Sequence, residues 1–242
     1  MVMLAGVDLA WQSTRNPTAI AFGALDGSFL SLLAVRESLY SHQALLTALQ
    51  DQPDLQGVAI DGPLIINNEQ GQRGCERELT RVYGSRHAGC HASNLTLYPD
   101  SDGVQLASAL VKQGFMHLAA PEGKWQLECY PHPALIEIFR LPERLPYKKG
   151  RVAERRLGQQ QLASLLDSLA SSAGITLSVP DHLNPYFDPA RIATLRGRQL
   201  KHNEDVLDAV ICLYIAALYQ SDHPGRVFGD RHNGYVYVPA GD

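Results

Sequence analysis

The chain has 242 residues, of which 45% are hydrophobic, and a formal net charge of −4. This length and composition suit one globular domain over residues 1–242 with a full buried core. The charge excludes a global basic field, so a polyanionic partner must be held by a local patch or through a metal ion. The apolar runs are too short for a membrane span, and the four scattered cysteines are typical of reduced core thiols. We therefore expect a cytoplasmic protein with no membrane partner.

The N-terminal half predicts a sheet that begins as a hairpin meander. Strands are predicted at residues 4–11, 18–25, 29–35, 57–63 and 125–130, with a short closing strand at 234–239. Asp26 and Gly27 predict the hairpin between the second and third strands. A helix at 41–50, capped by Ser41, then leads to the fourth strand, and this crossover implies a mixed sheet.

Two of these strands carry an acid among small neighbours. Alternation places Asp8 on one strand face with Gly6 and Ala10, and it places Asp61 on one face with Ala59. Small neighbours leave room for another element to pack against each acid. If the first and fourth strands are neighbours in the sheet, Asp8 and Asp61 lie side by side.

Residues 64–124 are predicted as a helical and loop insertion after the fourth strand. Its first helix, at 74–83, follows a row in which Arg73, Arg77 and Arg81 are spaced four apart and share one face. This row could contact phosphates, and the alternative is a solvated face paired with its own acids. Further helices are predicted at 103–118, 133–139 and 157–173, followed by a proline-rich loop at 180–189.

A second basic patch lies in segment 145–156. Lys148 and Lys149 are its first two basic residues, and they are predicted as further phosphate contacts. No aromatic-rich stretch of the sequence predicts a platform for stacking single strands.

A buried helix is predicted from Asn203 to Tyr219, because the eleven residues that follow Asp208 carry no charge. Asn203 is a good N-cap, which would place Glu204 and Asp205 in the first turn, where acids suit the helix dipole. Asp205 and Asp208 are three residues apart and share a face. Two carboxylates at the mouth of a buried helix need a cation or a proton between them. Capping with a buried hydrogen bond is the alternative.

The predicted metal ligands and catalytic acids are Asp8, Asp61, Asp205 and Asp208, and Glu128 is a further catalytic candidate. Such a cluster holds hard cations, typically Mg²⁺ or Mn²⁺, through its oxygen atoms. Two metals about 4 Å apart can activate a water molecule and stabilise the leaving oxygen of a phosphodiester. The alternative for each strand acid is a structural, hydrogen-bonded carboxylate.

Four motifs resemble those of the domain of unknown function 429 family, which is described as predicted RNase H-like nucleases. They are Gly6-Val-Asp8-Leu-Ala, Ala59-Ile-Asp61-Gly-Pro, Glu128-Cys-Tyr-Pro-His132-Pro and Asn203-Glu-Asp-Val-Leu-Asp-Ala209. The last motif also resembles the final helix of RuvC-type Holliday-junction resolvases. The resemblance implies an α/β, RNase H-like fold, with a mixed five-stranded sheet flanked by helices and the insertion at 64–124.

In this resemblance, Asp8 matches the first-strand acid, Asp61 the fourth-strand acid, and Asp205 and Asp208 the acids of the last helix. RuvC-type enzymes carry Glu where this chain has Asp61, and the shorter side chain reduces its reach to a metal. The resemblance implies a metal-dependent nuclease that acts on DNA or RNA, and it makes a homodimer a state to test.

Two other functions stay open. The same fold underlies ATPases and phosphotransferases that hold Mg-ATP with acids on equivalent strands. Their phosphate-binding turns are rich in glycine, whereas the turn at 12–16 has no glycine and Gly62 is followed by Pro63. A non-catalytic binding protein that kept the fold is the third reading, although all four aspartates are present.

Overall fold

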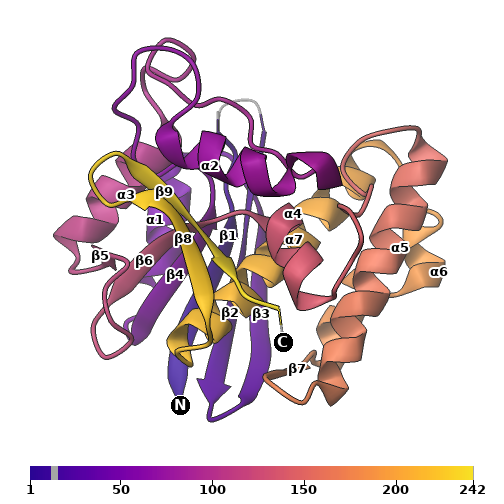
Figure 1. The fold of residues 1–242 in the computed structure, drawn as a ribbon. Helices are drawn as coiled ribbons and strands as arrows, with labels where there is room; N and C mark the ends of the chain where they lie inside the picture. The colour runs from indigo at the N-terminus through magenta and orange to yellow at the C-terminus, as the bar shows by residue number, and fades with distance from the viewer. Residues whose placement is uncertain (12–15, 242) are drawn as a thin grey trace.

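The computed structural model describes residues 1–11 and 16–241. Within these residues, nine strands form one mixed sheet in the order β7-β3-β2-β1-β4-β6-β9-β8, and β5 pairs with β6 beside this path (Figure 1). The polar turn predicted after the first strand includes residues 12–15, which lie outside the described residues. None of the described helices has both the length and the hydropathy needed to cross a membrane.

Five strands form the centre of this sheet. They are β1 (Val2–Asp8), β2 (Thr18–Asp26), β3 (Phe29–Leu39), β4 (Leu55–Asp61) and β6 (Trp125–Cys129). The first three form an antiparallel meander, β4 runs parallel to β1, and β6 runs parallel to β4. This order and these directions are those of an RNase H-like fold, so the predicted mixed α/β architecture is confirmed.

The sheet is larger than the five strands predicted for its core. Four more strands extend it: β5 (Met116–His117), β7 (Thr176–Ser178), β8 (Gly225–Asp230) and β9 (Gly234–Pro239). The closing strand predicted at 234–239 is confirmed as β9. The strands β5 and β7 have two and three residues, too few to produce a readable alternation of apolar and polar side chains.

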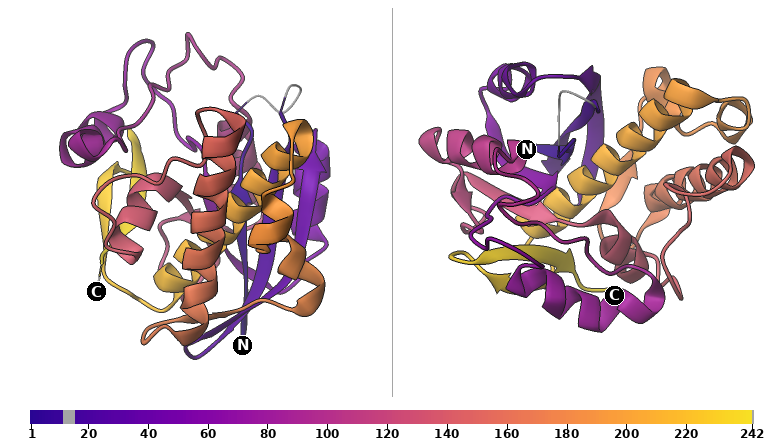
Figure 2. Two further views of the ribbon diagram at one scale, coloured as in Figure 1. Left: turned by 90° about the vertical axis from the view of Figure 1, so that its right-hand side faces the viewer. Right: turned by 90° about the horizontal axis from the view of Figure 1, so that it is seen from above.

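Helices cover both faces of the sheet (Figure 2). They are α1 (His42–Gln50), α2 (Gly74–Tyr83), α3 (Asp102–Lys112), α4 (Pro131–Ile138), α5 (Val152–Ser168), α6 (Pro189–Ile192) and α7 (Gly197–Gln220). One core lies between the sheet and α1 with α3, and the larger core lies on the face that α7 crosses. Helix α2 instead packs over β8 and β9 at the edge of the sheet.

Helix α7 begins at Gly197, so the prediction that it starts with Asn203 as its N-cap is wrong. Asn203 is buried inside the helix, and its side-chain oxygen accepts a hydrogen bond from Arg191 Nη1 at 2.9 Å. A tertiary partner therefore satisfies the amide that would otherwise cap the helix. Glu204 and Asp205 consequently lie about two turns inside the helix rather than in its first turn, where the helix dipole would favour them.

Two other helices also differ from their predicted bounds. Helix α3 ends at Lys112 rather than 118, because Gly114 adopts φ of 91° and the chain then enters β5. Helix α5 starts and ends five residues before the predicted 157–173, since Arg151 and Glu154 form a capping box that begins it at Val152.

Candidate active site

Asp8 and Asp61 end two neighbouring parallel strands, β1 and β4, where they are direct register partners. Helix α7 crosses this face of the sheet and carries Asp205 and Asp208, which are both buried. Asp8 interacts electrostatically with both α7 aspartates. The four aspartates that alternation and helical spacing singled out therefore come together at one end of the sheet.

Close packing of β1 against α7 places the acids together. A Cβ atom on Gly6 would lie 2.3 Å from the backbone oxygen of Ala209 and 2.0 Å from the backbone nitrogen of Leu213. Glycine is therefore required at this position, two residues before Asp8 on the same strand face. The small residue next to the acid makes room for the helix that brings the other acids.

Two lysines contact these carboxylates. Lys148 Nζ lies 2.8 Å from Asp208 Oδ2 and 3.4 Å from Asp61 Oδ2. Lys201 Nζ lies 2.6 Å from Asp205 Oδ1, and it also contacts Glu204 at 2.9 Å. The sequence predicted Lys148 as a phosphate contact and did not single out Lys201. A prediction that started the helix at Gly197 would have included Lys201. Helical spacing would then have placed Lys201 beside Glu204 and Asp205, which follow it by three and four residues.

Tyr147 fixes the orientation of one aspartate. Its buried hydroxyl donates a hydrogen bond of 2.6 Å to Asp208 Oδ1. Burial and the neighbouring Asp208 charge raise the pKa of Tyr147 well above its usual value, so the hydroxyl keeps its proton and remains a donor. Sequence reasoning missed Tyr147, because the loop around it has no periodic pattern.

Burial raises the pKa of Asp8 well above 3.8, and the charges of Asp208 and Asp205 add to this effect. Burial also raises the pKa of Asp61, although Lys148 opposes the shift. Burial alone would lower the pKa of Lys148, but the carboxylates around it raise that pKa well above 10.5. The lysines are therefore charged. Because the four aspartates outnumber the two lysines, the site favours binding of a further proton or a metal cation.

The chemistry of this cluster fits a hard divalent cation. Carboxylate oxygens are the ligands that Mg²⁺ and Mn²⁺ prefer. Among the described residues, Asp8 makes no ion pair, and the buried Asp205 Oδ2 has no hydrogen-bond partner. In the arrangement seen here, no three described Asp, Glu, His or Cys groups are placed to hold a metal ion. A cation would satisfy Asp8 and Asp205 Oδ2, because Lys148 already contacts Asp61 and Asp208, and Lys201 contacts only the other oxygen of Asp205.

Two clefts open beside Asp8. The first, of about 290 Å³, is also lined by Asp61, Lys148, Lys149 and Arg144. Lys149 is exposed, so this cleft offers positive charge at its rim. The second cleft, of about 410 Å³, is lined by Asp8, Leu9, Ala10, Trp11, Asn16, Pro17, Tyr98, Lys201 and Asp205. The acid cluster is thus reachable from two sides, one of them basic.

Glu128 borders a small cleft together with Asp61, but its carboxylate belongs to a separate buried ion network. Its Oε1 lies 2.5 Å from Arg73 Nη2, and its Oε2 accepts a hydrogen bond of 3.0 Å from the backbone of Leu64. Arg73 Nε also pairs with Glu76 at 2.8 Å. Arg73 already satisfies the Glu128 carboxylate, so the position gives no support to the predicted catalytic role of Glu128.

The prediction that Arg73, Arg77 and Arg81 form one exposed basic face is wrong for Arg73. Its side chain is 3% exposed, because it is the N-cap residue of α2 and the counterion of two buried carboxylates. Arg77 and Arg81 are exposed on α2. Neither is among the residues that line the two clefts at Asp8.

The profile of a family described as "Protein of unknown function (DUF429)" matches residues 6–233. No curated protein sequence matches the chain. Among solved structures, the chain is similar to a Fowlpox virus resolvase, described in complex with substrate Holliday junction DNA. The two share 10% sequence identity over 91% of this chain and 97% of that chain, with a TM-score of 0.38.

Proposed function

The chain belongs to the DUF429 family, and the profile that shows this is described only as a protein of unknown function, so we propose its function from the site itself. We infer that the protein is a divalent-metal-dependent nuclease, a hydrolase of phosphodiester bonds in DNA or RNA. The observation that carries this proposal is the meeting of Asp8 and Asp61 with Asp205 and Asp208 from α7 beside an open cleft. A structural acid cluster would have no need of a cleft with a basic rim.

The aspartates would hold Mg²⁺ or Mn²⁺. Asp8 and Asp205 are the first candidates, because they carry the carboxylate oxygens that described residues leave unpaired. Asp61 and Asp208 stand next to them, each in contact with Lys148. A cation bound there would supply a water nucleophile at neutral pH and would neutralise charge on the phosphate.

Other residues of the chain would orient the acids and bind the substrate. Tyr147 holds Asp208 in one orientation through its 2.6 Å hydrogen bond. Lys148 lies in the wall of the cleft as the counterion of Asp61 and Asp208, where its charge favours the ionised, metal-binding form of Asp61. Lys149 and Arg144, on the same wall, would bind flanking phosphates without reading sequence. Because the overall charge is −4, a polyanionic substrate must be held by a local basic patch or a metal ion, and these residues form such a patch.

The test is cleavage of a labelled panel in Mn²⁺: single- and double-stranded DNA and RNA, an RNA–DNA hybrid and a four-way junction. Asp8→Asn removes a charge with little change in volume, and we expect it to lower cleavage more than about a hundredfold while the circular dichroism spectrum is kept. Asp26→Asn is the matched control, because Asp26 is exposed in the hairpin at the other end of the sheet. Wild-type cleavage by Asp8→Asn would contradict the assigned site, and the preferred member of the panel would identify the substrate.

A further inference from the structure

Two aromatic side chains from distant segments meet beside the acid cluster. Trp11 follows β1, and Tyr98 lies in the long connection between α2 and α3. Their ring centroids are 5.2 Å apart with an interplanar angle of 75°, an edge-to-face contact. Both rings line the second cleft together with Asp8 and Asp205. The sequence predicted no aromatic platform, because 87 positions separate the two residues that form this one.

Both rings border a cleft, and neither belongs to a hydrophobic core of the described residues. Trp11 and Tyr98 are both half-buried. Trp11 lines the cleft on each side of Asp8. The other tryptophan, Trp125, is in contrast fully buried in the main core. An indole beside two openings has ring surface available for a ligand.

Hydrogen bonds hold the segment that carries Tyr98. The backbone nitrogen of Tyr98 donates to Asn94 O at 2.9 Å, and the nitrogen of Leu97 donates to Asn94 Oδ1 at the same distance. Asn94 is buried and donates through Nδ2 to Gly71 O at 2.9 Å. The ring is therefore positioned before any ligand arrives, which lowers the entropy lost on binding.

The charges of the two clefts indicate which part of a nucleotide each one suits. The first cleft has Lys149 and Arg144 at its rim and suits phosphates. The second holds Asp8 and Asp205, and its lysine, Lys201, is already paired, so a phosphate would be repelled there. A nucleobase is uncharged and has a flat π-face, and aromatic rings bind such faces without regard to sequence.

We propose that Trp11 and Tyr98 form a stacking site for one unpaired nucleobase next to the cleaved phosphate. This inference rests on the proposed nuclease function and names its substrate class: single strands, or unpaired nucleotides at loops, ends and branch points. A base in an intact duplex has no free face, and its extrusion would require the loss of pairing and stacking. The protein therefore selects strands by whether a base is free.

The test measures binding in EDTA, so that cleavage does not interfere. The probe is a short oligothymidylate, compared with a strand of equal length that is abasic at every position and with a duplex of equal length. Trp11 is the only half-buried residue of the two tryptophans, so quenching of tryptophan fluorescence reports on it. We expect quenching by the single strand, and weak quenching by the abasic strand and the duplex.

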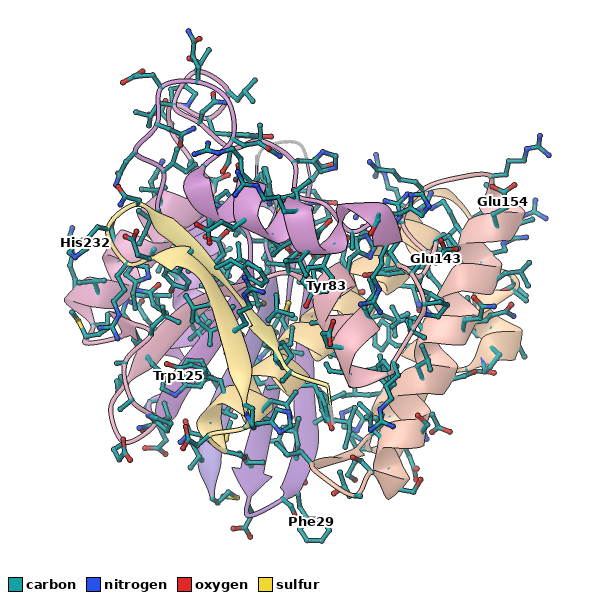
Figure 3. The ribbon with its side chains drawn as sticks, viewed as in Figure 1. Phe29, Tyr83, Trp125, Glu143, Glu154 and His232 are labelled. Carbon is teal, nitrogen blue, oxygen red and sulfur yellow. The ribbon has the colours of Figure 1, made fainter. Side chains whose placement is uncertain are left out.

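Variants separate stacking from charge. Trp11→Ala and Tyr98→Ala should each bind the single strand roughly five- to a hundredfold more weakly, whereas Tyr98→Phe, which keeps the ring, should bind nearly as wild type. Phe29→Ala is the control, because Phe29 is 66% exposed at the hairpin between β2 and β3 (Figure 3), and the strand register places Asp8 at the opposite end of β2. Wild-type affinity in both alanine variants, or equal quenching by duplex and single strand, would overturn the stacking site.

The two proposals fail in different ways. Quenching and ring-dependent binding without metal-dependent cleavage would support the stacking site and refute the nuclease. Cleavage that is lost in Asp8→Asn but unchanged in Trp11→Ala and Tyr98→Ala would support the nuclease and refute the stacking site. Absence of binding by every strand would refute the stacking site directly.

Discussion

Basic residues neutralise most of the buried carboxylates in and beside the candidate active site. Lys148 and Lys201 are internal counterions, and each one bridges two carboxylates. Buried ion pairs have a large desolvation penalty, so they are weak sources of stability, but loss of one partner leaves an uncompensated charge. The same reasoning applies to Arg73, which neutralises Glu76 and Glu128 in the neighbouring network.

Arg73→Met should therefore destabilise the protein strongly. The substitution keeps an apolar stem but leaves two buried carboxylates without their counterion, at a cost of about 3–5 kcal/mol. The melting temperature should fall by roughly 6–20 °C for a chain of this size. Arg77→Met is the matched control in the same helix, because Arg77 is exposed, and it should change the free energy of unfolding by less than about 0.5 kcal/mol. Equal melting temperatures for the two variants would contradict a structural role for Arg73.

The individual acids of the site could be predicted, and their counterions could not. Asp8 and Asp61 stand in strands whose alternation fixes the facing of each side chain, and Asp205 and Asp208 are fixed by helical spacing. Lys148 comes from a connection without regular structure, so no period places it in the site. Arg73 was predicted to be exposed because a spacing of four does not reveal whether a helix face is buried.

At the scale of elements, the contact between β1 and α7 holds the site together. Gly6 lets the backbones of β1 and α7 approach closely. This contact brings Asp8, two residues after Gly6, next to the aspartates of α7. Ten of the eleven uncharged residues after Asp208 are buried along the sheet and Tyr219 is half-buried, so the predicted buried helix is confirmed. The start of α7 was misplaced because Asn203 has the local chemistry of a cap, and only the tertiary partner Arg191 shows its actual role.

Gly6→Ala should separate these elements. The added methyl group would lie 2.0 Å from one α7 backbone atom and 2.3 Å from another, and neither atom is free to rotate away. Overpacking of a core typically destabilises by about 1–3 kcal/mol, and contact with backbone on both sides places this variant at or beyond the upper end. Cleavage should fall with stability, because the four aspartates would no longer meet.

Gly74→Ala provides the comparison for this variant. Gly74 is the first residue of α2, and a Cβ there meets no described atom within 4 Å. Alanine should be neutral or stabilising by up to about 1 kcal/mol. Chemical denaturation of both variants gives the free energies of unfolding. A Gly6→Ala protein as stable as Gly74→Ala would show that β1 and α7 are less tightly packed than described.

At the scale of the whole molecule, the fold collects negative charge at one end of the sheet. The raised pKa values of Asp8 and Asp61 mean that the folded state holds protons more tightly than the unfolded chain. Their contribution to stability is complete below pH about 3.8, and it is lost as the pH rises through the raised values. Without metal, wild type should therefore lose stability with rising pH relative to Asp8→Asn, which mimics the protonated acid.

A divalent cation should reverse this loss. Metal ligands must be deprotonated, so the rise in melting temperature produced by Mg²⁺ or Mn²⁺ should grow as the pH increases through the raised pKa values of Asp8 and Asp61 and should level off above them. At a metal concentration a hundred times the Kd, the stabilisation is about 2.7 kcal/mol, or roughly 5–10 °C for a chain of this size. Asp208→Asn should show a smaller rise, because one of the four acids is lost. Scanning calorimetry of both proteins, with metal and with EDTA, at several pH values measures this. Equal shifts in the two proteins would place the cation away from α7, and a shift that shrinks with rising pH would contradict binding at carboxylates whose pKa values are raised.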